Sequence, residues 1–227
     1  MGSHHKAIRA VDTGKFAEEI VPVTFKQKGV EVSVDRDEPP RRETTREQLT
    51  KLRAVYPDGI CTAGNSSSEN DGAAALVMTT PEVAEGHGAK PLVYLRAFGV
   101  AATDPTLTYP AVPAAVKRAL QRAVLTIDAM DLIEIQEAFA AQTLADAKLM
   151  GFSATDLEQK VNVNGSGISL GHPIGATGSV RLVTLIHEMV RRDARYGLVT
   201  ICGGGGLGIC VIVERKSTSS ASTFSVS

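Results

Sequence analysis

NVNGSGISLGHPIGATG, residues 162–178, is the stretch that decides how this chain folds and what it can do. Its closely spaced glycines let the backbone turn sharply and approach a ligand. His172 lies between Gly171 and Pro173, which limits its freedom and suits a residue that presents one imidazole nitrogen at a fixed geometry. An isolated Gly-His-Pro fits a structural loop with a surface histidine equally well, so the interpretation depends on the other motifs.

The second motif is CGGGGLG, residues 202–208, which directly follows the apolar run YGLVTI. If that run is a buried strand, the sulfur of Cys202 faces the ligand side of the loop. The following glycines leave backbone N–H groups unobstructed, and such groups can stabilise a developing oxyanion. A thiol with an ordinary pKa of about 8.5 can shuttle protons if its surroundings lower that pKa. The alternative is a glycine run that only joins two strands.

The third motif is QEAFA, residues 136–140, at a predicted strand-to-helix junction. Folds of the α/β class place active groups at the carboxyl ends of strands, where such junctions lie. The alternative is structural: Glu137 stabilises the helix N-terminus, and Phe139 belongs to the core.

The fourth motif is TAGNSSSENDGAAA, residues 62–75. Its structural interpretation is a capped helix start, for which Ser66, Ser67, Ser68 and Asn70 are all suitable caps.

Hydrophobic periodicity predicts an α/β domain from about Lys90 to Arg215, in which helices alternate with strands and an antiparallel pair closes the sheet. We expect helices at 115–124, 137–150 (ended by Gly151) and 179–192, strands at 91–101, 132–135, 196–202 and 207–215, and a strand running into a loop at 161–167.

The first 90 residues have a different character. We expect a helix at 6–19 broken by Gly14 and a strand at 20–25, then a charged surface loop to residue 58 with one short helix near 45–52. From residue 59, small residues and then an apolar run predict a buried helix start, a buried strand at 73–78 and a connection at 81–90. Residues 216–227, rich in Ser and Thr, are expected to be a disordered tail.

Composition limits the classes of function. The 227 residues are 43% hydrophobic and 22% charged, which is typical of a soluble globular protein. A net charge of −1 with both signs interspersed favours neither nucleic acid nor a membrane surface as partner. No apolar run approaches the roughly 18 residues that span a bilayer, and residues 1–5 do not resemble a signal peptide. Cys61, Cys202 and Cys210 form neither a disulfide framework nor a paired metal motif, so we expect a cytoplasmic protein.

Taken in order, the four motifs resemble the signature series of the thiolase family, as do EEIVPV (18–23) and TTREQLTKL (44–52). The likeness runs from about Lys6 to Arg215. It implies an α/β fold with a layered αβα thiolase C-terminal domain and mixed sheet over residues 90–215. Residues 59–89 would then be a fragment of the N-terminal thiolase domain, and residues 1–58 a remnant of its loop region with short helices.

The resemblance also implies a reaction and roles for individual residues. Thiolases cleave a 3-oxoacyl-CoA with coenzyme A, or condense two acyl-CoA molecules, with coenzyme A as substrate and no metal or covalently bound cofactor. His172 would activate the nucleophilic cysteine and help bind the thioester oxygen, and Cys202 would remove or return the substrate's α-proton. Gly204 would offer its N–H to an oxyanion hole, Ser67 would touch the pantetheine arm, and Phe139 would line its channel.

Gln136 departs from the family pattern. Many thiolases have Asn here, whose amide holds a water molecule in an oxyanion hole. The amide chemistry survives in Gln136, but one extra methylene moves the amide by about 1.5 Å, and misplacement on this scale lowers rates.

The larger departure is a missing half. A thiolase is roughly twice this length, and its nucleophilic cysteine lies in its first half; Cys61 belongs to the TAGN region and does not replace it. His172 and Cys202 would be an acid/base pair without an acyl acceptor. The strand at 73–78 would lack its neighbours and expose apolar residues. We therefore expect such a chain to aggregate or to pair with a complementary thiolase N-terminal half; intact thiolases are homo-oligomers.

Three functions compete at this point. The first is an acyltransferase half that works once joined to the missing half, which the intact set of His172, Cys202 and the following glycines favours. The second is a non-catalytic binding or scaffold protein that keeps the coenzyme A surface, toward which Gln136 leans. The third is a plain α/β domain with glycine-rich loops, which must treat four ordered motifs as coincidence.

Overall fold

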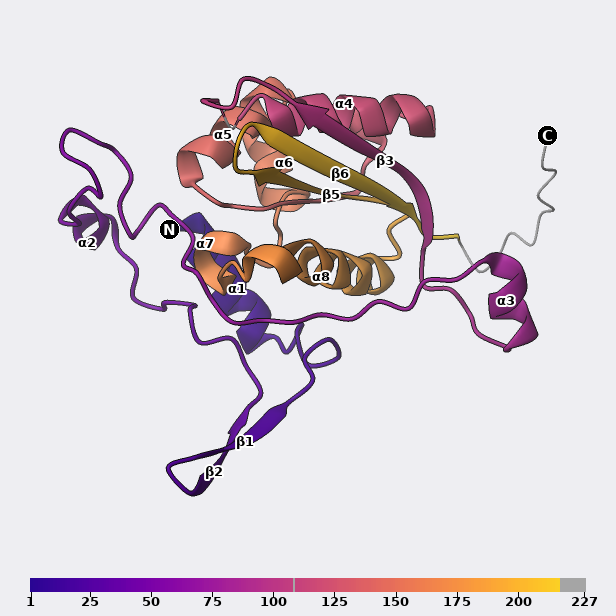
Figure 1. Cartoon of the computed structure of the whole chain (residues 1–227), viewed down its shortest axis with the longest axis horizontal. Helices are drawn as coiled ribbons and strands as arrows, with labels where there is room; N and C mark the ends of the chain where they lie inside the picture. Colours follow the sequence, from indigo (N-terminus) through magenta and orange to yellow (C-terminus); the bar gives the residue numbers. More distant parts are fainter. Residues whose placement is uncertain (108, 217–227) are drawn as a thin grey trace.

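The computed structural model describes residues 1–107 and 109–216, and a mixed four-stranded sheet forms its centre (Figure 1). The strands lie in the order β3 (Tyr94–Ala102), β6 (Leu207–Glu214), β5 (Tyr196–Gly203) and β4 (Leu132–Ile135). β6 is antiparallel to both of its neighbours, whereas β4 and β5 run parallel. The predicted strands and the closing antiparallel pair are therefore confirmed, although β3 begins three residues later than expected.

One helix packs on each face of this sheet, so the αβα layering is confirmed. α4 (Ala111–Ala123) packs against β3, β6 and β5, and α8 (Thr177–Arg192) packs on the other face against β5 and β4 (Figure 1). Gly99 lets α4 pack closely on β3. A Cβ added at this glycine would lie 2.2 Å from the carbonyl oxygen of Ala115, so a larger residue does not fit. The sheet is thereby held between two apolar layers.

The region between β4 and α8 holds the shorter elements. α5 (Ala140–Leu149) begins three residues later than predicted, because residues 138 and 139 pair with the segment around residue 66 instead. Gly151 follows its end with φ +80°, as expected. The sequence analysis did not predict α6 (Ala154–Gln159), although Ser153 and Asp156 form a capping box at its start. The short helices α7 (Gly167–Leu170) and η2 (Ile174–Ala176) complete this region, and η1 (Ile127–Ala129) precedes β4.

The strand predicted at 161–167 does not form. Residues 160–162 run along the open edge of β4. There the N–H of Ile133 donates to the carbonyl of Lys160, and the N–H of Asn162 donates to the carbonyl of Ile133. Asn162 has φ +48°, and its side-chain amide then bonds both the N–H and the carbonyl of Ile135. The side-chain amide of Asn162 thus makes the hydrogen bonds that a neighbouring strand would make. Hydrophobic periodicity in the sequence does not reveal such a contact.

The N-terminal segment packs onto the C-terminal unit. α1 (Gly2–Asp12) starts earlier and ends earlier than predicted, and a turn follows it. Ala7 and Ala10 are buried with Phe16 against Leu170 of α7. Lys6 donates to the carbonyl oxygens of residues 157 and 161, which fixes α1 beside α6.

Residues 20–58 contain a hairpin, whose first strand overlaps the strand predicted at 20–25 and whose remainder was predicted to be loop. β1 (Val23–Gln27) pairs with β2 (Val30–Val34), and the two turn residues Lys28 and Gly29 have φ of +50° and +83°. Two positive φ values define the turn type that suits a two-residue hairpin. The short helix predicted near 45–52 is confirmed as α2 (Arg46–Thr50), with a capping box between Thr45 and Gln48.

The predictions for residues 59–90 are largely wrong. After a turn at 63–65, residues 66–79 are extended, with no helix start and no strand at 73–78, and the expected connection contains α3 (Pro81–Gly86). Val77 is 99% exposed and Met78 is 72% exposed, since no neighbouring strand covers this stretch within the residues that the structure describes. The predicted tail after residue 216 lies outside the described residues. No helix in ranges 1–107 and 109–216 has the length and apolar character needed to cross a membrane.

Candidate functional site

The extended segment around Ser67 pairs with the QEAFA junction. Ala140 donates to the carbonyl of Asn65 at 2.8 Å, and Ser67 donates to the carbonyl of Ala138 at 2.9 Å. The Ser67 hydroxyl also reaches the Ala138 carbonyl at 3.2 Å, and the side chain is half-buried. The junction between β4 and α5 therefore gains an added strand-like neighbour, which is why it is not helical.

The same segment continues onto the Gly-His-Pro loop. The N–H of His172 lies 3.0 Å from the carbonyl of Ser68 and 3.2 Å from Oδ1 of Asn70, so it donates to both. Gly171 has φ +87°, and a Cβ there would lie 2.4 Å from the Asn70 oxygen. Gly72 packs just as closely on the ring of Pro173. Three motifs that are far apart in the sequence thus form one structure, and the helix-capping interpretation of the serines is wrong.

The His172 ring is fixed by α8. Its Nδ1 lies 2.6 Å from Oγ1 of Thr177, the first residue of that helix and fully buried. Burial, and then the charge of Arg181, lower the pKa of His172 below its ordinary value. A neutral ring that donates from Nδ1 to Thr177 has Nε2 as its basic atom. His172 is therefore prepared to accept a proton at neutral pH.

Cys202 lies at the end of β5, next to the strand that leads into Gln136. The N–H of Gln136 donates to the carbonyl of Thr200 at 3.0 Å, which joins the two strand ends. Burial, followed by the charge of Asp146, raises the pKa of Cys202. The surroundings of this thiol therefore do not lower its pKa. The thiol is protonated at neutral pH. No hydrogen bond joins Cys202 to His172 within the described part of the chain.

Asp146 and Gln142 form a buried polar pair that the sequence analysis missed. Asp146 is 0% exposed, and Gln142, one turn earlier on α5, donates to it. Burial raises the pKa of Asp146 to about 7, against the hydrogen bond from Gln142. An acidic residue four positions after a glutamine in an alanine-rich helix was the available signal.

Gln136 is completely buried. A Cβ added at Gly167 would lie 2.2 Å from its Nε2, so the amide packs against the start of α7. Neither Nε2 nor Oε1 has a hydrogen-bond partner among the described residues. A buried amide without partners costs free energy, which makes Gln136 an unusual feature of the region.

The other predicted site residues are accessible. Gly204 is exposed in the turn between β5 and β6, where an added Cβ would meet no atom. Gly206 has φ +75° and packs against the carbonyl of Asp104, so the loop has a fixed base. Phe139 is 42% exposed at the start of α5.

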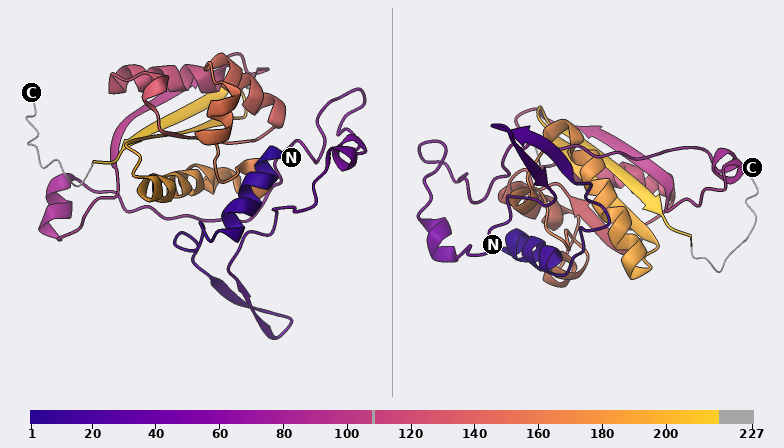
Figure 2. Two further views of the ribbon diagram at one scale, coloured as in Figure 1. Left: turned by 180° about the vertical axis from the view of Figure 1, so that it is seen from behind. Right: turned by 90° about the horizontal axis from the view of Figure 1, so that it is seen from below.

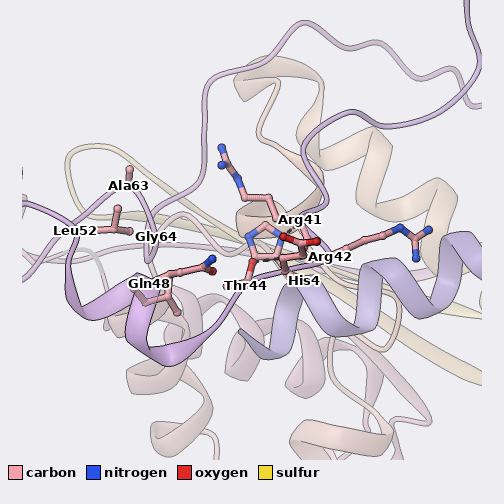
Figure 3. A pocket seen from close by; sticks show the side chains of 10 residues that line it. His4, Arg41, Arg42, Thr44, Gln48, Leu52, Ala63 and Gly64 are labelled. Carbon is pink, nitrogen blue, oxygen red and sulfur yellow. Dashed lines mark hydrogen bonds between the residues drawn. The ribbon is translucent and has the colours of Figure 1, made fainter.

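A separate cleft of about 570 Å³ lies away from these residues (Figure 3). It is formed by the start of α1, residues 41–52 and the 63–64 turn, and none of the predicted site residues lines it. At its base the N–H of Arg41 donates to Nδ1 of His4 at 3.2 Å. Burial, followed by the nearby positive charges, lowers the pKa of His4. In ranges 1–107 and 109–216, no group of three or more His, Cys, Asp or Glu side chains is placed to hold a metal ion.

A layered αβα unit in which one segment ties a histidine loop to an EAFA junction carries the ordered motifs that resemble the thiolase family. The family model "Thiolase, C-terminal domain" matches residues 89–215, and "Thiolase, N-terminal domain" matches residues 1–82. The chain belongs to the thiolase family, as the resemblance indicated.

Individual relatives agree with this assignment. The chain is 45% identical over 215 residues to an acetyl-CoA acetyltransferase of Pseudomonas aeruginosa and 47% identical over 215 residues to the beta-ketothiolase BktB of Cupriavidus necator. Each alignment covers 94% of this chain and 54% of the relative. The crystal structure of the Bacillus anthracis acetyl-CoA acetyltransferase matches with a TM-score of 0.90 and 41% identity, covering 94% of this chain and 54% of that one. Human mitochondrial 3-ketoacyl-CoA thiolase matches with a TM-score of 0.86 and 36% identity, covering 94% of this chain and 53% of that one. The chain thus spans about half the length of the proteins it matches.

Proposed function

We propose that this chain carries the acid/base half of a thiolase-type acyltransferase, and that it acts on coenzyme A thioesters when a nucleophile-bearing half completes the site. The reaction is the reversible thiolysis of a 3-oxoacyl-CoA or the Claisen condensation of two acyl-CoA molecules. The observation that carries this proposal is the pairing of the TAGNSS segment with both the EAFA junction and His172, because it positions residues from three motifs around one surface.

Two side chains supply the proton transfers. His172, neutral and held through Nδ1 by Thr177, takes the proton of the nucleophilic thiol that the other half contributes. The resulting thiolate attacks the 3-oxo carbon, and the bond between C2 and C3 breaks. Cys202, whose thiol is protonated at neutral pH, then gives its proton to the carbanion of the departing acetyl-CoA. Coenzyme A then attacks the acyl-enzyme thioester; its thiol proton goes to the Cys202 thiolate, and His172 returns its proton to the released nucleophile. In the synthetic direction Cys202 first gives its proton to the leaving coenzyme A and then, as a thiolate, removes the α-proton.

The remaining predicted site residues bind and stabilise. Gly204 lies in an exposed turn directly after Cys202, as an N–H donor to a developing oxyanion requires. Ser67 and Phe139 lie on facing backbone segments and are both accessible, as suits a surface for the pantetheine arm of coenzyme A. For Gln136 the role is an amide in an oxyanion hole, reached by rotation away from Gly167.

The division of the chain follows from the same proposal. Residues 90–215 form the C-terminal domain, residues 59–89 belong to the N-terminal domain, and residues 1–58 to its loop region. The extended and exposed apolar stretch at 73–78 supports this division, since its strand neighbours would come from the other half.

Thiolysis of acetoacetyl-CoA tests the proposal. We would assay the purified chain alone, and then the chain co-expressed with the first half of the Pseudomonas aeruginosa relative. The expected result is activity only in the co-expressed complex and its loss in His172→Ala. Equal activity with His172→Ala would contradict the role given to this residue, and silence of a soluble complex would reject the catalytic proposal.

One observation favours a second candidate, a coenzyme A-binding protein without catalysis. Gln136 is fully buried with both amide atoms unpartnered, so its amide does not lie on the accessible surface of the site. Coenzyme A binding by a complex that performs no thiolysis, restored to activity by Gln136→Asn, would identify Gln136 as the cause.

A further inference from the structure

The buried pair of Gln142 and Asp146 on α5 is not explained by stability. Asp146 is 0% exposed and Gln142 is 6% exposed, yet Oδ1 of Asp146 and Oε1 of Gln142 have no hydrogen-bond partner among the described residues. Burial and the hydrogen bond from Gln142 are what act on the Asp146 carboxyl, and no cation of the described ranges compensates its charge. Burying a carboxylate without a cation costs free energy, and a hydrophobic side chain of similar size would avoid this cost.

Strand register places the side chain of Cys202 on the side of the sheet that carries α4. Cys202 is opposite Gly208 in the β5–β6 pair, and opposed residues of an antiparallel pair point the same way. A Cβ added at Gly208 would lie 2.4 Å from the carbonyl oxygen of Ala111, the first residue of α4. Alternation along β5 agrees, because Leu198 lies four positions earlier and packs in the core beneath α4. Cys202 therefore points toward α4 and away from α8.

The helix α5 belongs to the same layer as α4. It contacts α4, and both helices lie on the side of the sheet opposite α8, in Figure 1 and in the reverse view of Figure 2. The buried residues of α5 share one face of the helix, and they are Gln142, Thr143, Asp146 and Ala147. Asp146 thus lies on the inward face of α5, in the layer toward which Cys202 points.

Asp146 is also the charged group that acts on Cys202. The other titratable groups on the surrounding elements are Lys117, Arg118 and Arg122 of α4, Lys148 of α5, Cys210 of β6, Glu137 before α5, and Glu134, Arg181 and His172 toward α8. The two α4 arginines donate to carbonyls of β3, and Arg181 acts on Glu134 and on His172. Among the described residues, only the charge of Asp146 adds to burial in disfavouring the thiolate of Cys202.

We infer that Asp146 is a positioning residue that acts through Cys202: its carboxylate, when ionised, disfavours the Cys202 thiolate and keeps this sulfur in the protonated form that donates in thiolysis. The catalytic meaning rests on the proposed function, whereas the effect of one group on the other does not. Two negative charges in a buried layer repel more strongly than in water, because the effective dielectric constant is lower. Since the pKa of Asp146 is raised to about 7, this repulsion appears as pH rises through neutrality.

Alkylation of Cys202 by iodoacetamide tests the inference in the full-length chain, without any partner half. The thiolate displaces iodide from the reagent, so the rate at each pH follows the thiolate fraction. Cys202 is half-buried and lies two residues before the exposed Gly204, which gives the reagent access. Mass spectrometry of the peptides measures Cys202 and Cys61 separately, and Cys61, which lies outside α5 and the sheet, serves as an internal reference.

Asp146→Asn keeps the size of the side chain and removes its charge. The rate of Cys202 alkylation in this variant, divided by the rate in the unchanged chain, is expected to be close to 1 at pH 6, where Asp146 is protonated in both senses that matter for charge. At pH 8 the ratio is expected to reach about threefold or more. Glu158→Gln, which removes a carboxylate of α6 that is 62% exposed, is the matched control and is expected to keep the ratio at 1 throughout.

A ratio for Asp146→Asn that stays at 1 up to pH 8 would overturn the inference. A ratio raised equally at pH 6 and pH 8 would overturn it as well, because it would show a change in access and not in charge. Circular dichroism checks that the variant folds. If it does not, the unchanged chain gives a second measurement: the logarithm of its Cys202 rate should rise by clearly less than one per pH unit between pH 7 and 8, and a rise of one would overturn the inference. The expected rates together with an inactive complex would reject the proposed function and keep this inference.

Discussion

Two antiparallel hairpins of the same chain differ sharply in what holds them. β5–β6 lies at the centre of the sheet, with Leu198 and Ile212 fully buried on its α4 face. β1–β2 has an equally regular register, and Val23, Phe25, Val32 and Val34 share one of its faces, yet every residue of β1 is exposed. The first hairpin is stabilised by a core within the chain, whereas the second is formed by its turn and presents an apolar face without a cover.

The contrast extends to the two matched regions. Residues 89–215 contain the sheet and most of its covering, and their apolar side chains largely find partners within the same region. Residues 1–82 attach to that unit through α1 and the TAGNSS segment, while much of their remaining apolar surface stays exposed. A region can therefore match a family although much of its apolar surface is exposed.

The largest expected effect is the difference in the free energy of unfolding between a variant of the core and a variant of the exposed hairpin. Leu198→Ala should lower the free energy of unfolding by about 3–4 kcal/mol, since it leaves a cavity between the sheet and α4. Phe25→Ala, which removes a larger side chain, should change it by less than about 0.5 kcal/mol. Urea denaturation of both variants measures these changes. Similar losses of unfolding free energy in the two variants would show that the hairpin is buried in solution.

The buried carboxyl of Glu134 in β4 should give the C-terminal unit a pH-dependent stability. Burial raises the pKa of Glu134 to about 8, only partly offset by the charge of Arg181. The folded state keeps this proton up to about pH 8 while the unfolded state loses it near pH 4.5, so stability falls as pH rises between these values.

Glu134→Gln removes this titration. Its free energy of unfolding relative to the unchanged chain should therefore rise between pH 4.5 and 8, by on the order of 5 kcal/mol. Glu19 and Asp146, whose pKa values are also raised to about 7, are common to both proteins and cancel in the difference. A difference that does not change with pH would mean that Glu134 is ionised in the folded state.

Lys15 links the N-terminal segment to α8 and should have an intermediate effect. Its ammonium group donates to Asn164 and to Glu188, both at 3.1 Å. Lys15→Met should cost about 1 kcal/mol, because Arg191 and Arg192 still pair with the buried Glu188 carboxylate. Faster proteolysis within residues 1–40, with little change in the global transition, is the expected readout; a large global loss would show that the two regions unfold as one.

The capping box of α2 should matter least. Thr45→Ala removes the hydrogen bond to the N–H of Gln48, which costs about 1 kcal/mol of local helix stability. No residue of α2 is buried, so the global transition should stay within about 0.5 kcal/mol. Amide exchange across residues 46–50 should accelerate, and unchanged exchange would show that packing and not the cap holds this helix.

The sequence predicted the C-terminal sheet well because its periodicity is local. The strands around Leu198 and Ile133 are short apolar runs, and α8 shows the 3.6-residue period, so each follows from its own residues. The apolar run at 73–78 has the same pattern but no neighbour, and a strand requires one. Only the start of the hairpin at 23–34 was predicted, as the strand at 20–25, because the charged residues that follow hide the continuing alternating pattern.

The site was predictable only in its parts. Glycine spacing and motif order made His172 and Cys202 candidates, but they did not predict the hydrogen bonds that tie Ser68 and Asn70 to the histidine loop, since these join residues about 100 positions apart. The raised pKa of Cys202 and the buried amide of Gln136 also depend on neighbours from other elements. Such effects of burial and of long-range charges cannot be derived from a motif alone.

The most direct test of the central claim, that this chain holds acid/base groups but no acyl acceptor, is the location of the covalent acyl group. The chain alone and the co-expressed complex would be incubated with acetyl-CoA, quenched in acid and analysed by mass spectrometry of the separated polypeptides. The account predicts one acetyl group on a cysteine of the partner half and none on Cys61, Cys202 or Cys210. An acetyl group on any of these three cysteines would contradict it and would place the nucleophile in this chain.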